Sequence, residues 1–272
     1  MNALQKKEFE LLKVFIDICT SHGLRYYLVC GSALGAVKYG GFIPWDDDVD
    51  VALPRTDYEK FLSVAQKEVP PNVFVQNCRT DKYYPGLGTK LRNSETTFIE
   101  KEASKIPMNH GIFIDIFPLD GYPSDEKQAR LFEKKKLYYY RHRYTRLIPP
   151  VHRDIPLTFY SLLFRFFGLY GETNDACKKN EELIKSNPET ESALWCNFAN
   201  SMSRKEYSEK EIYGDGSVLK FEGIDVTVPE KYKEYLTIKY GDISFDPPPE
   251  EQKGSHGYIV DTEKPYTHYL AE

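Results

Sequence analysis

Residues 31–53 constrain this chain most, because they set a run of aspartates in an apolar stretch, GSALGAVKYGGFIPWDDDVDVAL. Asp46, Asp47 and Asp48 lead directly into a short hydrophobic segment that contains Asp50. Side chains alternate between the two faces of a strand, which predicts that Asp48 and Asp50 point the same way. Neighbouring carboxylates repel each other unless protons or a cation neutralise them. A cluster of oxygen ligands suits Mg²⁺ or Mn²⁺ better than zinc, so the pattern predicts a site for a hard divalent ion.

The alternative is a solvated acidic turn, because charge runs usually face water. The residues upstream favour a functional site. Residues 26–30 are predicted to form a short buried strand, and Gly31 and Ser32 follow it where a helix over residues 33–39 begins. Backbone N–H groups and the positive end of a helix dipole bind phosphate at such a junction. Gly31 and Ser32 are therefore candidate phosphate-binding residues next to the predicted metal site.

A second acidic position lies in the apolar strand predicted over residues 111–117. Asp115 stands there among isoleucine and phenylalanine residues. Burying a carboxylate without compensation is costly, so a metal, a partner or a substrate is expected to balance its charge. An aspartate that turns to water or pairs with an arginine is the alternative reading. Asp120, in the turn that follows, is expected to make a local hydrogen bond.

Further side chains are candidates for contact with a substrate. Lys90 and Arg92 alternate on a predicted strand, so both can face one side and neutralise phosphate. Lys38 lies on the helix after the Gly-Ser turn. The alternative for all three side chains is that they are ordinary surface cations in contact with water. Trp45 either stacks on a base or head group or wedges the loop. No histidine stands in a zinc-binding pattern. His110 and His256 are candidate substrate contacts.

These motifs resemble those of the LicD/fukutin family, within the nucleotidyltransferases of the polymerase β type. The resemblance rests on Gly35 and Lys38, on residues 41–48 (GFIPWDDD) with Asp50, and on residues 110–120 (HGIFIDIFPLD). A thinner match is Tyr240-Gly241-Asp242 followed by three prolines. It implies an α/β (α+β) fold, with a mixed β-sheet core, flanking helices and a largely helical C-terminal lobe. It also implies that Asp115 completes a two-metal site with the aspartates of the first motif.

The resemblance also implies an activity. A metal-dependent phosphotransferase would carry a phospho-alcohol, with phosphocholine from CDP-choline as the first expectation, to a hydroxyl of a lipid-linked glycan such as a teichoic acid, lipopolysaccharide or capsule precursor. Asp48, Asp50 and Asp115 are its catalytic candidates, and its metal ligands are Asp46, Asp48, Asp50 and Asp115. A nucleotidyltransferase that adds a nucleoside monophosphate to a small molecule or protein would use the same aspartates. A binding protein without catalysis is the third reading, and it predicts loss of the acidic ligands.

The length, charge and cysteine content of the chain narrow its possible domain organisation, function and location. A chain of 272 residues suggests a core, residues 1–122, with an appended lobe, residues 123–272. A formal net charge of -5 argues against general binding of nucleic acid. The five cysteines show no C-x-x-C pair and are expected to be reduced, buried thiols. With neither a signal peptide nor a membrane-spanning stretch in the sequence, a cytoplasmic location is expected.

The second half contains a cationic and aromatic tract over residues 134–146, placed on a long helix that Ser124 could cap. Residues 155–170 form an apolar segment interrupted by Arg165. A core helix is one reading of that segment, and an interfacial helix beside anionic lipid at the inner membrane surface is the other. Further on, a helix over 176–185, a hairpin over 220–228, a helix from Pro229 to Tyr240 and an extended proline arm are predicted.

Overall fold

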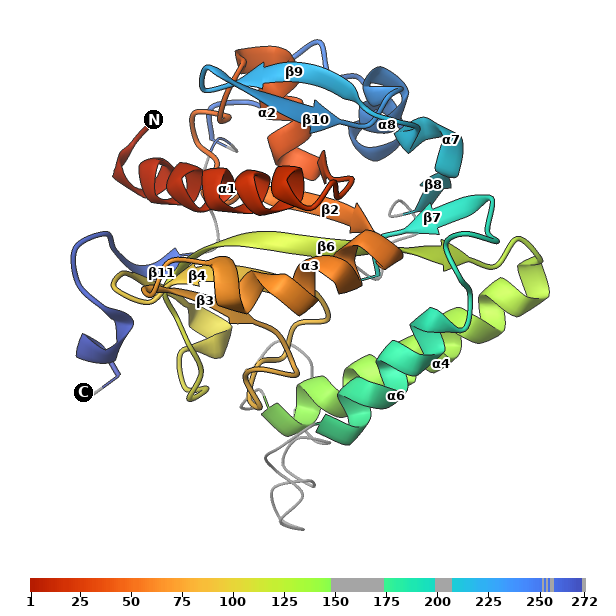
Figure 1. The fold of residues 1–272 in the computed structure, drawn as a ribbon, viewed down its shortest axis with the longest axis horizontal. Coiled ribbons are helices and arrows are strands. Elements are labelled where there is room, and N and C mark those ends of the chain that lie inside the picture. Colours follow the sequence, from red (N-terminus) through yellow and green to blue (C-terminus); the bar gives the residue numbers. More distant parts are fainter. Residues whose placement is uncertain (148–173, 199–206, 251, 253, 255–256, 271–272) are drawn as a thin grey trace.

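A computed structural model of the chain describes residues 1–147, 174–198, 207–250, 252, 254 and 257–270 (Figure 1). The N-terminal half supplies α1 (Ala3–Ser21), β1 (Tyr27–Leu28), α2 (Cys30–Tyr39), β2 (Asp50–Pro54), α3 (Arg55–Glu68), β3 (Val73–Gln76), β4 (Thr89–Asn93), β5 (Thr97–Glu100), η1 (Lys101–Ala103) and β6 (Ile112–Tyr122). The remainder supplies α4 (Glu126–Leu147), α6 (Asn174–Lys185), β7 (Leu194–Cys196), β8 (Tyr207–Glu209), α7 (Lys210–Tyr213), β9 (Ser217–Phe221), β10 (Ile224–Val228), α8 (Tyr232–Tyr240), β11 (Gly257–Asp261) and η3 (Tyr266–His268). The predicted mixed sheet with flanking helices is confirmed.

The main sheet has the strand order β1-β2-β6-β4-β3, and β7 joins the far end of β6 with β8 beyond it. The pair β2 and β6 is parallel, whereas β1, β4, β3, β7 and β8 add antiparallel neighbours. Strand β6 is the longest, with 11 residues, so it passes from the main sheet into the β7–β8 extension. The acidic strand β2 therefore lies next to the most central strand of the fold.

One large apolar core lies between this sheet and the helices that pack on it. Helix α1 contributes an apolar stripe, with Leu12 and Phe15 completely buried. The same cluster includes Phe221, Val228 and Leu236 from the C-terminal hairpin and helix α8. In Figure 1 the hairpin β9–β10, α2 and α8 form a layer above the sheet, while α4 and α6 run side by side below it. Segments far apart in sequence thus meet around β2.

Several predicted boundaries differ from the structure. Helix α2 begins at Cys30, so Gly31 and Ser32 lie in its first turn rather than before it. Helix α3 begins at Arg55 without a local side-chain cap. Instead, the distant Glu189 accepts a hydrogen bond from the Thr56 N–H at 3.1 Å. Helix α8 begins at Tyr232 rather than at Pro229. Residues 155–170 lie outside the described part of the chain.

The cysteines divide into two kinds. Cys19, Cys30 and Cys196 are free and buried, as predicted. Cys78 is disulfide-bonded, so the expectation of a reduced thiol is wrong at this position. Disulfides are uncommon in cytosolic proteins, and the cysteines therefore do not by themselves indicate a reducing compartment.

Candidate active site

Two carboxylates lie on neighbouring strands at the centre of the sheet. Asp50 opens β2, and in the parallel register it stands directly beside Asp115 of β6. The Asp115 N–H donates to the Val49 carbonyl at 2.8 Å, which holds the two strands together at this point. Adjacent positions on paired strands carry their side chains on the same face. The sheet therefore brings together two aspartates that are 65 residues apart in the sequence.

Burial and like charge act together on Asp50, which is 8% exposed. Burial raises the pKa of Asp50, the negative charges of Asp48 and Asp115 raise it further, and only the cation of Lys239 on α8 opposes them among the main contributions. Asp48 itself lies before β2 begins, so the predicted alternation of Asp48 and Asp50 on one strand is wrong. Asp46, Asp47 and Asp48 belong to the loop before β2, here called the acidic loop. This loop nevertheless keeps Asp48 close enough to act on Asp50 electrostatically.

The turn from β1 into α2 is tied directly to the start of β2. The Ser32 hydroxyl accepts a hydrogen bond from the Asp50 N–H at 2.9 Å. Cys30 has a φ of 52°, a conformation that favours glycine, and its N–H donates to the Tyr235 hydroxyl at 3.1 Å. Backbone strain of this kind concentrates at functional sites. Ser32 therefore positions Asp50, whereas the sequence alone predicted it as a phosphate contact.

Gly31 is needed because a carboxylate approaches the first turn of α2. A Cβ at Gly31 would lie 2.7 Å from Oδ2 of Asp46. A negative charge at a helix N-terminus is stabilised by the helix dipole and the free N–H groups. In this structure the Asp46 carboxylate lies beside Gly31 at the first turn of α2.

The predicted cations Lys90 and Arg92 share one face of β4 but have different surroundings. The Lys90 ammonium lies 3.0 Å from Oδ2 of Asp115 and 3.3 Å from the ring centre of Phe113. Arg92 is completely buried, and its guanidinium donates to Gln76 and, at 2.7 Å, to the Gly111 carbonyl. Lys90 therefore faces the aspartate pair, whereas Arg92 supports the sheet behind it.

Lys38 and Trp45 lie where α2 meets the C-terminal arm. The Lys38 ammonium is 2.5 Å from the Asp246 carboxylate, which also accepts from the Tyr39 hydroxyl at 2.5 Å. The ring of Trp45 stands edge-on to Tyr39 with the centroids 6.1 Å apart. Lys38 is thus paired within the protein, and Trp45 packs against Tyr39 next to Asp46 in the sequence.

Of the two histidines that the sequence suggested, the structure describes His110. His110 is completely buried, and one ring nitrogen bonds the Ile106 carbonyl at 2.9 Å. Burial lowers the pKa of His110, which favours the neutral ring. His256 lies outside the described residues.

Sequence reasoning missed four side chains that surround the acidic loop. They are Gln5, Glu8, Glu222 and Lys239. Glu222 accepts a hydrogen bond from the Phe42 N–H at 3.1 Å, and its own N–H donates to the Gly40 carbonyl at 2.8 Å. Gln5 and Glu8 carried a detectable signal, because they continue the buried stripe of α1 with polar residues. Glu222 and Lys239 carried none, since more than 170 residues separate them from the residues they affect.

The C-terminal arm passes close to the loop. A Cβ built on Gly254 would lie 3.1 Å from the Asp47 carboxylate. Three residues later, β11 begins and pairs with β5. The described parts of the arm therefore pair with Lys38 at Asp246, approach Asp47 at Gly254 and join β5 at β11.

The donors at this site suit a hard cation by their chemistry. Burial and the charges of neighbouring aspartates raise the pKa of Asp50, so a cation would relieve an unfavourable concentration of negative charge. Within the described ranges, however, no group of three or more His, Cys, Asp or Glu side chains is arranged to hold a metal ion. The Lys90 ammonium is the cation beside Asp115 here. The carboxylates thus fit Mg²⁺ or Mn²⁺ in kind, without forming a complete ligand shell in this conformation.

Glu8→Gln is expected to raise the thermal unfolding temperature of the metal-free protein at pH 8. Burial raises the pKa of Glu8, and the charges of Asp48, Asp47 and Asp46 raise it further. Between the unfolded and folded pKa values the folded state holds more protons, so stability falls as pH rises through that window. Glutamine removes this loss, and its benefit should vanish near about pH 4, where both states are largely protonated. Melting curves in chelator across pH would contradict the expectation if the gain were independent of pH.

The sequence of the chain is similar to that of known proteins in the region of this site. Residues 23–153 match the family described as LicD/FKTN/FKRP, nucleotidyltransferase domain. The lipopolysaccharide cholinephosphotransferase LicD of Haemophilus influenzae is 28% identical over 263 residues, which cover 90% of this chain and 92% of that protein. The ribitol 5-phosphate transferase FKRP of Homo sapiens is 40% identical over 48 residues, or 18% of this chain and 10% of that protein. The matched residues contain β2, β6 and the acidic loop, so the part of the chain that holds the aspartates matches the LicD/FKTN/FKRP nucleotidyltransferase domain.

Proposed function

We propose that this chain is a phosphotransferase that moves a phospho-alcohol from a CDP-activated alcohol to a hydroxyl of a glycan. Phosphocholine from CDP-choline is the first choice, because the relative that matches most of the chain is named a cholinephosphotransferase. The match to a ribitol 5-phosphate transferase supports the wider class of phospho-alcohol donors. The proposed acceptor is a lipid-linked glycan such as a precursor of teichoic acid, lipopolysaccharide or capsule.

The observation that carries the proposal is the pair Asp50 and Asp115, side by side on parallel strands, with the Lys90 ammonium at 3.0 Å from Asp115. Phosphoryl transfer is catalysed mainly by positioning and by electrostatic stabilisation of charge on the transferred group. A rigid central sheet that holds two acids and one cation on one face supplies such positioning.

The proposed reaction exchanges one P–O bond for another. The acceptor hydroxyl oxygen forms a bond to the phosphorus that bears the alcohol, and the bond from that phosphorus to CMP breaks. CMP leaves with the bridging oxygen, and the Asp115 carboxylate receives the hydroxyl proton. Lys90 offsets phosphate charge, and Ser32 keeps Asp50 in place through the Asp50 N–H.

Asp46, Asp48, Asp50 and Asp115 would hold the proposed Mg²⁺ or Mn²⁺. Such ions, when bound, polarise phosphate oxygens and lower the pKa of the attacking hydroxyl. The residues themselves would keep the ions beside the central strands, because Asp50 and Asp115 extend from paired strands rather than from a free loop.

We expect CDP-choline to raise the unfolding temperature of the protein only when Mg²⁺ or Mn²⁺ is present. A ligand that binds the folded state alone stabilises it by about 2.7 kcal/mol at 100 times its Kd. Thermal shift measurements with CDP-choline, CDP-glycerol and CDP-ribitol, each with metal and with chelator, check the donor and the metal together. Equal stabilisation in chelator would contradict the metal-dependent site.

The released nucleotide separates this proposal from nucleotidyl transfer. Phospho-alcohol transfer to a glycan releases CMP and leaves the alcohol on the sugar. Transfer of a nucleoside monophosphate to a small molecule or protein would instead release pyrophosphate from a nucleoside triphosphate. Product analysis with both donors, using the Asp50→Asn variant as the background, identifies the reaction.

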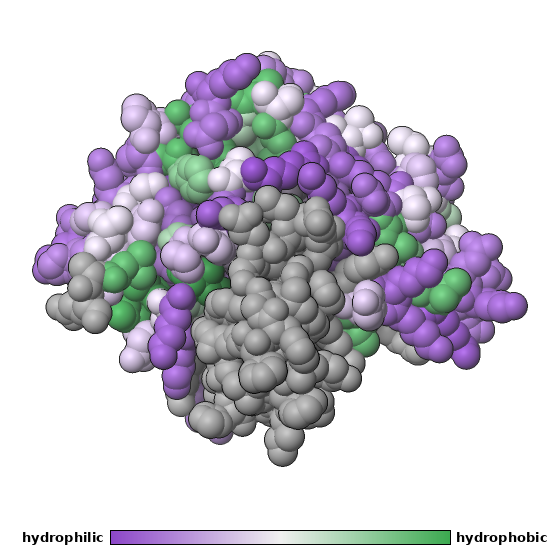
Figure 2. All heavy atoms as spheres, turned by 90° about the horizontal axis from the view of Figure 1, so that it is seen from below, coloured by the Kyte–Doolittle hydropathy of each residue, from purple (hydrophilic) through white to green (hydrophobic). Residues whose placement is uncertain are grey.

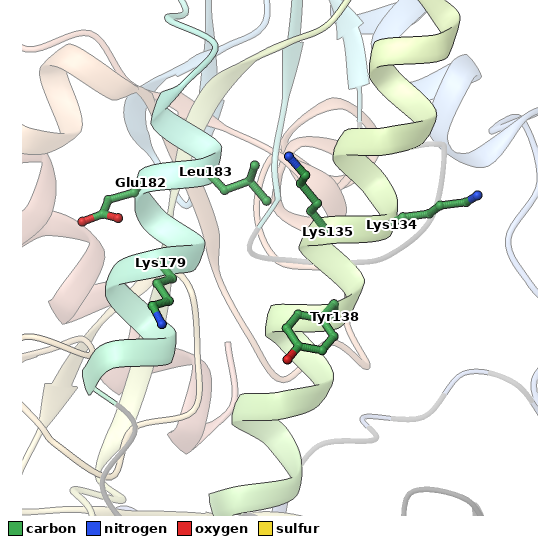
Figure 3. Close-up of a pocket in the computed structure, with 6 residues that line it drawn as sticks. All are labelled: Lys134, Lys135, Tyr138, Lys179, Glu182 and Leu183. Atoms are coloured by element: carbon green, nitrogen blue, oxygen red, sulfur yellow. The ribbon is translucent and has the colours of Figure 1, made fainter.

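We further propose that the enzyme works at the cytoplasmic face of the membrane and contacts it peripherally. An open cavity of about 500 Å³ between α4 and α6 is lined by three lysines and one acid, with Tyr138 and Leu183; the charged residues are Lys134, Lys135, Lys179 and Glu182. Figure 3 shows Lys135, Tyr138 and Leu183 projecting toward the space between the helices, while Lys134 points away from it. In Figure 2 the described surface on the lower face is largely hydrophilic. No helix in the described ranges has the length and apolarity to cross a bilayer.

Binding to anionic liposomes should therefore be electrostatic. Each lysine near an anionic surface contributes about 1 kcal/mol, and salt should weaken the effect. The test variant is Lys134→Glu with Lys135→Glu, since Lys136 is buried and contacts the ring of Phe198. The matched control is Lys60→Glu with Lys67→Glu on α3, which makes the same change in net charge at exposed positions. Equal loss of co-sedimentation in both variants, or binding to neutral liposomes, would contradict docking through α4 and α6.

A further inference from the structure

One side chain connects the N-terminal end of α1 to the acidic loop. Gln5 is 3% exposed, and its side-chain amide donates to the Ile43 carbonyl at 3.2 Å and to the Asp46 carbonyl at 3.1 Å. These two carbonyls belong to a turn that the Asp46 N–H closes on the Ile43 carbonyl at 3.0 Å. The turn leads directly into Asp47 and Asp48. Both amide protons of Gln5 are therefore used to hold the backbone that carries the aspartates.

The side-chain oxygen of Gln5 has a second, separate role. The Gln5 side-chain oxygen accepts a hydrogen bond from the Asn2 N–H at 3.0 Å, and the Asn2 side chain accepts from the Gln5 N–H at 2.9 Å. Together they form the capping box of α1. The oxygen of Gln5 thus serves the helix and its nitrogen serves the loop, so that the two tasks can be separated by substitution.

The loop needs such an anchor because its own charges oppose its position. Glu8, almost one turn beyond Gln5, is 1% exposed, and its Oε2 has no hydrogen-bond partner among the described residues. Glu8 carries its carboxyl on the same helix as Gln5 and interacts electrostatically with residues 46–48 of the acidic loop. Carboxylates crowded on one side of a turn tend to push it away from the helix. The two donors of Gln5 act in the opposite sense.

We propose that Gln5 is a positioning residue, which sets the placement of Asp46 and Asp48 for cation binding through the carbonyls of Ile43 and Asp46. This proposal rests on the proposed function only in that these aspartates bind a hard cation. It assigns to α1 a role in the site beyond packing against the sheet.

Gln5→Glu tests the proposal, because glutamate keeps the oxygen that accepts from Asn2 and replaces the donating amide with an acceptor. We expect at least a fivefold weaker affinity for Tb³⁺, measured by luminescence that Trp45 sensitises, and at least a tenfold lower turnover. The matched control is Asn2→Ala, which removes the helix cap but keeps the Gln5 donors. It should lower the unfolding temperature and leave Tb³⁺ affinity within twofold of wild type. Gln5→Met, which lacks donors and charge, should weaken Tb³⁺ binding as well.

The outcomes separate this proposal from the proposed reaction. Wild-type binding of Tb³⁺ without any phospho-alcohol transfer would remove the proposed function and leave the positioning role standing. Unchanged Tb³⁺ affinity in Gln5→Glu, or an equal loss in Asn2→Ala, would overturn the positioning role whatever the activity. A wild-type protein that binds no Tb³⁺ would overturn it too.

Discussion

Asp48→Asn and Asp50→Asn are each expected to leave less than about one hundredth of wild-type turnover, on the scale seen when one electrostatic contact to a transition state is lost. The reason is that phosphoryl transfer depends on charge stabilisation, which a neutral amide cannot give to a cation. Asp115→Asn should do the same, because Asp115 stands beside Asp50 across the parallel pair. Steady-state transfer assays with saturating Mg²⁺ measure the effect. Turnover above a tenth of wild type in either of the first two variants would count against their assignment.

The stability of the Asp50→Asn variant is not expected to fall with its activity. Burial and the charges of Asp48 and Asp115 raise the pKa of Asp50, so the carboxylate is unfavourable in the metal-free fold. Asparagine at this position should therefore leave the unfolding temperature in chelator unchanged or raise it, which rules out misfolding as the cause of lost activity. Asp225→Asn is the matched control, since the Asp225 side chain is 66% exposed and forms an ion pair with Lys220 across the hairpin. It should change neither quantity measurably.

The parts of the site that follow from local pattern could be predicted from the sequence. The apolar run around Asp115 predicts a buried strand, and the Gly-Ser turn predicts a strand-to-helix junction, both of which the structure contains. The family resemblance linked Asp115 to Asp50, and the sheet places them as neighbours. The sequence could not show where β2 begins. That boundary depends on pairing with β6, so the expected alternation of Asp48 with Asp50 failed.

The roles of the cations could not be predicted, because surroundings far along the chain decide them. Arg92 and Lys90 alternate on β4 as expected, yet Gln76 and Gly111 enclose the arginine while the lysine meets Asp115. Lys38 carries no local sign that Asp246, 208 residues later, is its partner. Such contacts form only when the C-terminal arm packs over α2.

Asp120 shows the same limit and leads to the prediction with the largest expected effect on stability. The sequence suggested a local turn bond, and this is wrong. Asp120 lies on β6 and accepts two hydrogen bonds from Arg55, at 2.6 Å from Nε and 2.7 Å from Nη2. The Asp120 side chain is 1% exposed and that of Arg55 is 11% exposed. This pair joins α3 to the central strand beneath the core.

Arg55→Met should therefore lower the free energy of unfolding by about 3–5 kcal/mol at pH 8, because it leaves the Asp120 carboxylate buried without a partner. Burial already raises the pKa of Asp120 against the opposing effect of Arg55, and removal of Arg55 raises it further. The folded state then holds a proton that the unfolded state loses, so the deficit grows with rising pH and shrinks toward about pH 4. Urea unfolding at both pH values measures it.

A double variant separates the loss of a partner from the loss of an interaction. Arg55→Met with Asp120→Leu replaces both charges by apolar groups, and such exchanges are often close to neutral for stability. We expect the double variant to be more stable at pH 8 than Arg55→Met alone, with little dependence on pH. Equal destabilisation in the two would mean that Arg55 acts through Glu59, 3.2 Å away, and the network beyond it rather than through Asp120. That network includes Arg79, Glu181 and Lys185. The comparison thus decides whether the central strand is held by one buried pair or by the surface charges of α3 and α6.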